Sequence, residues 1–371
     1  MVERENEPKK YNPNSYEVLS PLQFIKDFSE EAKNAKERVW TQSMVFQTGT
    51  GTSVIENSLI MAAKRKVDAR RTRDYFTNIE MRKVNSDKKE EILFQDRDSR
   101  KKMREAGVLL TTTNKTFFAD VFPFFWRNHT KVHIVDNVAW IGGVNLRDDH
   151  YDRADFVVKI KNPEVVSALA MLFVQVNKNR PLKDYKKKIN DEFTLWVDRG
   201  SIGKSIIYER AEQMVDQAQK SIRFISQLPP SGKLLHEMIK SADRGVRVCL
   251  VLPSYQYVNR VSFPFNKLAQ FENWRLARAV SGHEKNMNIV RFEGNNGLVH
   301  GKMIVTDEKN ALWGSHNFAR SGVMAGTQEA DLETTNPLLI KKLTNWFDSI
   351  PNGTYDLGFQ QGPFNPLTAQ K

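Results

Sequence analysis

The chain has 371 residues, of which 40% are hydrophobic and 27% are charged, so it is not wholly disordered and is long enough for two packed lobes. Its formal net charge of +12 indicates an anionic partner, such as a nucleic acid, an acidic phospholipid or a phosphorylated substrate. Cys249 is the single cysteine, which excludes an intramolecular disulfide.

The chain starts with a polar and charged segment that is not typical of a signal peptide, and it contains no run of about 20 apolar residues. We therefore expect a cytoplasmic protein that can bind peripherally to the inner face of the membrane. Residues 1–15 predict a flexible tail. A polar stretch over 177–190 divides the rest into a first lobe over 16–190 and a second lobe over 191–371.

Helices and strands alternate in the predicted order of elements. The first half predicts a helix over 21–35, a strand over 39–46, a helix over 54–64, a strand over 67–70 and a charged helix over 81–106. The second half predicts a helix over 208–219, a strand over 222–225, a helix over 233–242 and a strand over 246–252. This alternation is typical of an α/β fold.

Two related strings indicate an internal duplication. H-T-K-V-H-I-V-D runs from His129 to Asp136, and H-G-K-M-I-V-T-D runs from His300 to Asp307. Each is followed by a Gly-x-x-Asn segment, an acidic residue, and an Asn-Pro pair that predicts the start of a helix. Counting back seven residues from each Asn-Pro pair aligns Asp155 with Glu329. Because these features recur in the same order, coincidence is negligible.

The repeated His-Lys pairs carry chemistry suited to a phosphodiester. Residues i and i+2 of a strand share a face, so His129 and Lys131 are expected to project together, as are His300 and Lys302. Cleaving a phosphodiester requires a nucleophile, a proton donor for the leaving oxygen, and cations near the non-bridging oxygens. Histidine can attack or donate a proton, and lysine supplies charge. We predict these four residues to be catalytic.

Four acidic residues are expected to support them. Asp136 and Asp307 close the two motifs and are grouped with the catalytic residues, although a structural role in a turn is equally consistent with their position. Asp155 and Glu329 are the candidates that orient the histidines, because a carboxylate bonded to the distal ring nitrogen fixes the tautomer.

The loops after the motifs predict substrate contacts. Asn145, Ser315 and Asn317 supply neutral hydrogen-bonding groups beside glycines that allow the backbone to approach a bound group. His133 extends the first motif to H-x-K-x-H, which could suggest a metal. A lysine between two imidazoles would repel a cation, so no metal and no cofactor are expected.

An aromatic segment precedes the first motif. Its side chains could form core, stack on nucleic-acid bases, or contact acyl chains and a membrane, and Pro123 argues against a regular core strand. We group four of them as candidate membrane or acyl contacts: Phe122, Phe124, Phe125 and Trp126.

Both motifs, with their Gly-Gly-x-Asn and Gly-Ser-x-Asn segments, resemble the duplicated HKD motifs of the phospholipase D superfamily, most closely its cardiolipin synthase-like branch. The resemblance covers the chain from about Phe24 to Phe347. It implies two similar α/β lobes packed about a pseudo-twofold axis, one active site, a covalent phosphohistidine intermediate and no required metal. It also implies that His129 is the nucleophile and His300 the acid.

The sequence also departs from the family pattern. The transmembrane helices typical of bacterial cardiolipin synthases are not found in this sequence, and Gly143 occupies the position that matches Ser315, so the halves are not equivalent.

The favoured function is a phosphatidyltransferase or phosphodiesterase acting on glycerophospholipids, with an anionic membrane surface as its partner. The alternative is a metal-independent endonuclease acting on DNA or RNA, which the net positive charge also suits. A non-catalytic binding protein is disfavoured because both His-Lys pairs are intact. The expected oligomeric state is a monomer, while the headgroup and the acceptor are left open.

Overall fold

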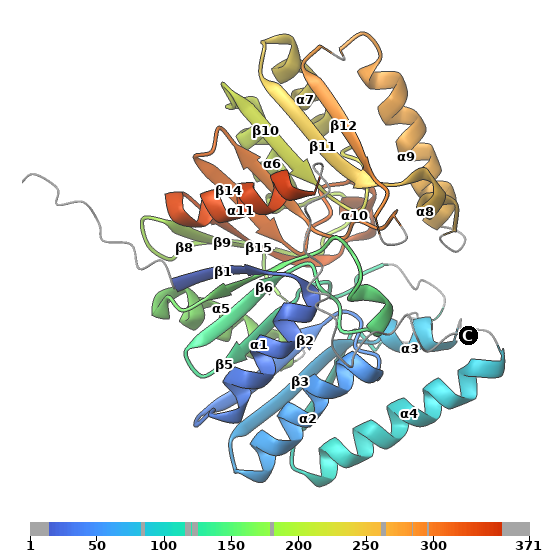
Figure 1. Ribbon diagram of the computed structural model, residues 1–371, viewed down its shortest axis with the longest axis vertical. Coiled ribbons are helices and arrows are strands. Elements are labelled where there is room, and N and C mark those ends of the chain that lie inside the picture. Colours follow the sequence, from blue (N-terminus) through green and yellow to red (C-terminus); the bar gives the residue numbers. More distant parts are fainter. Residues whose placement is uncertain are drawn as a thin grey trace, which may run out of the picture.

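The computed structural model describes residues 15–82, 86–115, 120, 125–178, 182–260, 265–283, 285–294 and 297–350. Within these ranges the chain forms two mixed β-sheets, one above the other in Figure 1, with helices packed on their faces. The predicted α/β fold of two similar lobes is confirmed. The predicted tail over 1–15 lies almost wholly outside the described residues.

The first lobe is built on a seven-stranded sheet. Its strands in spatial order are β1 (Tyr16–Leu19), β7 (Val157–Ile160), β6 (Val138–Gly142), β5 (Val132–Val135), β2 (Arg38–Ser43), β3 (Asp68–Asp74) and β4 (Leu109–Thr113). Strands β2, β3 and β4 are parallel, and the other neighbouring pairs are antiparallel. The helices are α1 (Pro21–Lys33), α2 (Thr50–Lys64), α3 (Phe76–Arg82), α4 (Ser86–Glu105) and α5 (Pro163–Asn177).

The second sheet repeats this order with one added strand. From the corresponding edge its strands are β8 (Tyr185–Lys188), β9 (Phe193–Arg199), β15 (Gln328–Thr334), β14 (Asn310–Gly314), β13 (Met303–Thr306), β10 (Ser221–Ile225), β11 (Arg247–Pro253) and β12 (Met287–Phe292). The helices are α6 (Ile206–Asp216), α7 (Lys233–Asp243), α8 (Tyr255–Arg260), α9 (Phe265–Val280), α10 (Arg320–Ala325) and α11 (Pro337–Ser349). Strand β8 pairs with β9 in this sheet, although it precedes residue 190, where the sequence placed the end of the first lobe.

Local signals explain where several helices begin. Asn162 caps α5 by accepting hydrogen bonds from the backbone of Glu164 and Val165, and Asn336 caps α11 through Leu339, as the Asn-Pro pairs predicted. Helix α4 accounts for Ser86–Glu105 of the charged helix predicted over 81–106, residues 81 and 82 belong to α3, and residues 83–85 lie outside the described residues. Among the described helices, none combines the length and the apolar character needed to span a bilayer.

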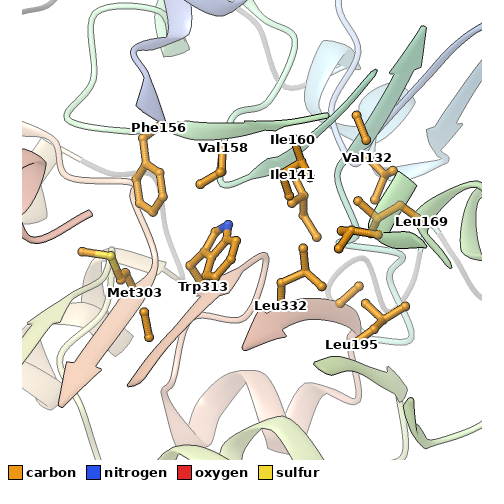
Figure 2. Close-up of a cluster of buried hydrophobic side chains, with 14 of the residues drawn as sticks. Val132, Ile141, Phe156, Val158, Ile160, Leu169, Leu195, Met303, Trp313 and Leu332 are labelled. Carbon is orange, nitrogen blue, oxygen red and sulfur yellow. The ribbon is translucent and has the colours of Figure 1, made fainter. Parts of the chain in front are cut away.

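The two lobes share one hydrophobic core. Figure 2 shows Trp313 of β14 near Phe156 and Val158 of the first lobe, with Met303 and Leu332 beside it from the second. All of these side chains are buried, and helices α5 and α11 cover the same cluster. The outer faces of the sheets form separate cores, with α1 and α2 on the first lobe and α6 and α7 on the second. Because the central core draws on both sheets, the lobes bury it only by packing together.

Asp136 and Asp307 lie at the ends of β5 and β13 that are farther from the His-Lys pairs. The Asp136 carboxylate accepts hydrogen bonds from the backbone N–H groups of residues 36 to 38, at 2.8–2.9 Å. The Asp307 carboxylate accepts the corresponding bonds from residues 219 to 221, at 2.7–3.1 Å. Grouping these two aspartates with the catalytic residues is therefore corrected: they fix the turns that lead into β2 and β10.

Truncating the tryptophan at the centre of the shared core should destabilise both lobes together. We expect Trp313→Ala to lower the free energy of unfolding by about 3–5 kcal/mol, because it leaves a cavity between the sheets. Denaturant unfolding followed by circular dichroism measures the free energy of unfolding of the variant and of the wild type. Met61→Ala, at a half-exposed position on α2, is the control and should change stability by less than about 0.5 kcal/mol. Two separate transitions in the wild type would contradict the shared core.

Removing the charge of Asp136 should weaken its turn. Burial would raise the pKa of this carboxyl, but its backbone donors lower it, so its stabilisation is present at neutral pH and is lost as the pH falls through the lowered pKa. We expect Asp136→Asn to cost about 1–3 kcal/mol at pH 7 and much less in acid. Asp98→Asn, which removes an exposed ion pair with Lys102 on α4, is the control. Equal losses in both variants would contradict the anchoring role.

Candidate active site

The two His-Lys pairs lie just before their strands rather than within them, which corrects the expectation that they share a regular strand. Strand β5 begins at Val132 and β13 begins at Met303. The preceding backbone instead pairs with the other lobe: His129 N donates to Gln328 O at 2.9 Å, and His300 N donates to Ala154 O at 2.9 Å. Each histidine is therefore fixed against the opposite lobe.

Buried Asp74, at the end of β3, holds the segment that leads into the first histidine. Its carboxylate accepts hydrogen bonds from the Asn128 backbone and the Asn114 side chain, both at 2.8 Å. Arg127 Nη1 lies 3.4 Å from the same carboxylate. These contacts set the position of His129 from within its own lobe.

The orienting carboxylates are exchanged between the lobes. His129 Nδ1 lies 2.9 and 3.0 Å from the two carboxylate oxygens of Glu329, which belongs to the second lobe. His300 Nδ1 lies 2.7 Å from Asp155 Oδ2, which belongs to the first lobe. All four side chains are buried. With Nδ1 bonded in each ring, Nε2 is the nitrogen left to react.

Burial sets the charge states of these pairs. It lowers the pKa of His129 to about 4 and that of His300 well below its ordinary value, so both imidazoles are neutral at pH 7. Burial alone would raise the pKa of Glu329, but His129 and its hydrogen bond lower it to about 2. Burial raises the pKa of Asp155 to about 6. Both carboxyl groups are therefore mainly ionised at neutral pH and accept from Nδ1–H.

Two buried lysines give the site its positive charge. Lys131 and Lys302 are at most 1% exposed. Lys131 Nζ donates to His129 O at 2.7 Å, and Lys302 Nζ donates to His300 O. Burial lowers the pKa of Lys131 to about 7, assisted by the charge of Lys302, and lowers the pKa of Lys302 to about 8. A bound anion would stabilise both ammonium groups, which makes the site suited to a phosphate.

The difference between Gly143 and Ser315 has a steric cause. A Cβ atom at Gly143 would lie 2.3 Å from Asp155 Oδ1 and 2.8 Å from the carbonyl oxygen of His300. The short aspartate side chain thus lies against the backbone and requires glycine there. In the second lobe the acid is the longer Glu329, and the matching loop position carries a serine.

The predicted substrate-binding side chains divide into two groups. Asn145 Oδ1 lies 3.3 Å from both Val45 N and Ser43 Oγ, and Ser315 Oγ accepts from Ala330 N at 3.0 Å. These two side chains order their own loops. Asn317 Oδ1 is buried without a hydrogen-bond partner among the described residues, which leaves it able to accept a hydrogen bond from a ligand.

Two basic residues beside His300 were not assigned a role at the site from the sequence. The rings of His150 and His300 lie 5.5 Å apart in an edge-on arrangement, and buried Arg153 bonds to His150 Nδ1 at 2.9 Å. The Arg153 charge further lowers the pKa of His300. Arg153 precedes Asp155 by two residues, and side chains two residues apart in an extended chain lie on the same side. This spacing could have indicated that Arg153 lies near the active site.

A buried acidic group lies behind His129. Asp331 follows Glu329 by two residues on β15, and its Oδ1 accepts from Ser315 N at 2.8 Å. Asp198 faces Glu329 across the β15–β9 pair, and burial raises its pKa to about 7. His316 is buried near Glu329 and lies 3.4 Å from Ser205 Oγ. The surroundings of His129 are thus richer in acids than those of His300.

His133 lies apart from this chemistry. Its Nδ1 bonds to Thr41 Oγ1 at 2.7 Å, and its ring lies 4.7 Å from that of Phe24 in the core of the first lobe. Among the described residues, no group of three or more His, Cys, Asp or Glu side chains is arranged to hold a metal ion.

The aromatic segment is only partly described, since Phe122 and Phe124 lie outside the described residues. Phe125 is half-buried and Trp126 is 48% exposed. Trp126 N donates to Ala325 O of the second lobe at 3.1 Å. Half-exposed Met324 precedes that residue, and half-exposed Ile202 lies beside Gly326. We call Trp126, Met324 and Ile202, three exposed apolar side chains on neighbouring segments of the two lobes, the apolar patch.

Comparison with known proteins identifies related sequences. The family described as cardiolipin synthase, PLD-like domain, matches residues 212–350. Cardiolipin synthase A of Buchnera aphidicola subsp. Schizaphis graminum is 24% identical over 246 residues, covering 58% of this chain and 47% of the relative. Cardiolipin synthase B of Salmonella typhi is 22% identical over 213 residues, covering 52% of this chain and 48% of the relative. The chain thus spans about half the length of the curated relatives it matches.

Solved structures share the fold at low sequence identity. Phosphatidylserine synthase of Haemophilus influenzae Rd KW20 superposes with a TM-score of 0.71 at 13% identity, covering 90% of this chain and 86% of the other. Polyphosphate kinase of Porphyromonas gingivalis superposes with a TM-score of 0.58 at 12% identity, covering 90% and 50%. Together with the duplicated motifs, the sequence matches support a similarity of this chain to the phospholipase D superfamily, in its cardiolipin synthase-like branch.

Proposed function

We propose that the chain is a phospholipase D-type enzyme that transfers or hydrolyses the phosphodiester of a glycerophospholipid. The observation that carries this proposal is the pair of histidines, each bonded to a carboxylate of the other lobe, beside two buried lysines. The names of the related cardiolipin synthases, and that of the structurally similar phosphatidylserine synthase, support a lipid substrate over other phosphodiesters.

The reaction proceeds in two balanced steps. His129 Nε2 attacks phosphorus, the bond to the leaving alcohol oxygen breaks, and protonated His300 gives that oxygen its proton. An acceptor, water or an alcohol, then attacks the phosphohistidine, His300 takes the acceptor's proton, and the phosphorus–nitrogen bond breaks. Lys131 and Lys302 hold the non-bridging oxygens throughout, so no step requires a metal.

The surroundings of the histidines support this division of roles. A phosphohistidine carries positive charge on its ring, and ionised Glu329 stabilises that charge through Nδ1–H. Arg153 opposes a lasting positive charge on His300, which favours release of its proton to the leaving oxygen. The negative charge of a bound phosphodiester raises the pKa of His300 and allows it to be protonated before the first step.

The apolar patch around Trp126 is the proposed contact with acyl chains, with half-buried Phe125 behind it. Backbone hydrogen bonds connect this patch to the active site. Gln328 N donates to Arg127 O, and His129 N donates to Gln328 O. A peripheral position at an anionic membrane surface would bring this patch to the lipid.

The lipid assignment is tested by assaying the purified protein on phosphatidylglycerol vesicles and on DNA in parallel. We expect release of the headgroup, or its transfer to an alcohol, from the lipid. His129→Ala and His300→Ala should each reduce that rate by at least about a thousandfold, since both residues act on the same phosphorus, and the double variant should lose little more. His133→Ala is the matched control and should retain most of the rate.

Two experimental outcomes would contradict the proposed function. Full activity in either single histidine variant would exclude the paired mechanism. Cleavage of DNA without action on any phospholipid would replace the lipid assignment with a metal-independent endonuclease, which the net charge of +12 suits.

The buried lysines predict the pH dependence of kcat/KM, which reports groups of the free enzyme. The pKa values of Lys131 and Lys302 are lowered to about 7 and about 8, so their positive charge is present below this range and is lost as the pH rises through it. We expect kcat/KM on a short-chain soluble phosphodiester to fall across this range. A constant rate there would contradict the assignment of the lysines to phosphate binding.

A further inference from the structure

Helix α9, at the outer edge of the second lobe in Figure 1, has an unusual exposed face. Lys267, Phe271, Trp274 and Arg278 follow the helical spacing that puts side chains on one face, and exposed Arg275 lies beside them. Phe271 is 52% exposed and Trp274 is 57% exposed. We call these five residues the α9 surface.

The side chains of this surface are ordered against one another. The rings of Phe271 and Trp274 are stacked, with centroids 6.0 Å apart and planes inclined by 23°. Arg275 lies over the Phe271 ring at 5.6 Å, and Arg278 lies over the Trp274 ring at 5.7 Å. Two aromatic rings and two guanidinium groups thus form a continuous amphipathic face.

The packing of α9 against the second lobe does not explain why Phe271 and Trp274 are exposed. Leu276 on the opposite face enters the core of the second lobe, and Ala269, Glu272 and Asn273 are also buried. Glu272 is the single acidic residue of α9, so the exposed face carries basic charge without a carboxylate on the same helix face.

Helix α4 provides a contrast within the same chain. It also exposes a large aromatic side chain, Phe94, at 67%. Its charges are mixed, with ion pairs between Lys102 and Asp98 and between Lys101 and Glu105. Exposure of an aromatic residue is thus not particular to α9, whereas α9 combines two exposed aromatic rings with basic side chains and, within the helix, only the buried acidic residue Glu272.

Helix α8, which precedes α9, begins near the segment that leads into His300. Helix α8, which leads to α9, starts directly after β11, and Ser254 N donates to Gly297 O at 2.9 Å. Gly297 precedes His300 by three residues. Figure 1 shows α8 at the end of α9 that is nearer the first lobe, so α9 runs from the side where the lobes meet along the outer edge of the second lobe.

We propose that the α9 surface docks the protein onto a bilayer of anionic phospholipid, an inference that rests on the lipid function proposed above. Arginine and lysine bind the anionic headgroups, while Phe271 and Trp274 enter the interface between headgroups and acyl chains. A single-stranded nucleic acid is the weaker candidate, because its stacking sites lie in basic grooves and the α9 surface is one face of a helix.

Vesicle sedimentation tests this proposal with the whole 371-residue chain, using phosphatidylcholine vesicles with and without phosphatidylglycerol. The wild type should bind the anionic vesicles, and added salt should weaken binding. Phe271→Ser with Trp274→Ser, and separately Arg275→Ser with Arg278→Ser, should each weaken binding about tenfold or more. Both variants should keep the wild-type rate on a monomeric short-chain phosphatidylglycerol, which shows that they are folded.

Two controls match these variants. Phe94→Ser with Arg97→Ser makes the same kinds of change on α4 and should leave vesicle binding unchanged. Phe271→Trp with Trp274→Phe exchanges the two aromatic side chains and should retain binding. Wild-type vesicle binding by both serine variants would overturn the proposal, as would loss of DNA binding in them without loss of vesicle binding.

The outcome is separable from that of the proposed function. Vesicle binding that depends on α9 without any turnover of lipid would refute the enzymatic assignment and leave the docking surface in place. Turnover of vesicle lipid that does not depend on α9 would refute the docking surface alone.

Discussion

The reciprocal hydrogen bonds between each histidine and a carboxylate of the other lobe are the interaction on which the site depends. Glu329 orients His129, and Asp155 orients His300, so neither lobe contains a complete pair. The backbone repeats the exchange, since each histidine N–H donates to a carbonyl of the opposite lobe. The shared hydrophobic core holds these bonds in register, because Trp313 and its neighbours leave water only when the lobes are packed together.

Burying this many ionisable groups costs free energy, and the arrangement limits that cost. Each histidine is neutral and bonded to a carboxylate, while the lysines lie close enough to the carboxylates to be stabilised by them. Their pKa values are still well below that of a free lysine. A phosphodiester anion between the lysines would favour their charged forms, which agrees with the substrate class proposed for the site.

The two halves of the duplication place corresponding residues around each histidine, but these residues differ in detail. Gly143 allows Asp155 to approach the backbone, whereas Ser315 accompanies the longer Glu329. Arg153 lies near His300, while additional carboxyl groups lie near His129. Differences of this kind give two similar histidines different tendencies to hold a proton, which the proposed two-step transfer would require. Outside the site, α9 exposes two stacked aromatic rings beside basic side chains, whereas the exposed Phe94 of α4 lies on a helix with ion-paired charges of both signs.

The sequence by itself determined the α/β class, the duplication, the caps of α5 and α11, and the alignment of Asp155 with Glu329, because periodicity, caps and repeats are local signals. The tertiary structure decided the rest. It exchanged the carboxylates between the lobes, assigned Asp136 and Asp307 to turns, and brought Arg153 beside His300. Such contacts join residues up to 200 positions apart. They depend on how the two sheets pack across a common core, and this packing cannot be predicted from any short stretch of sequence.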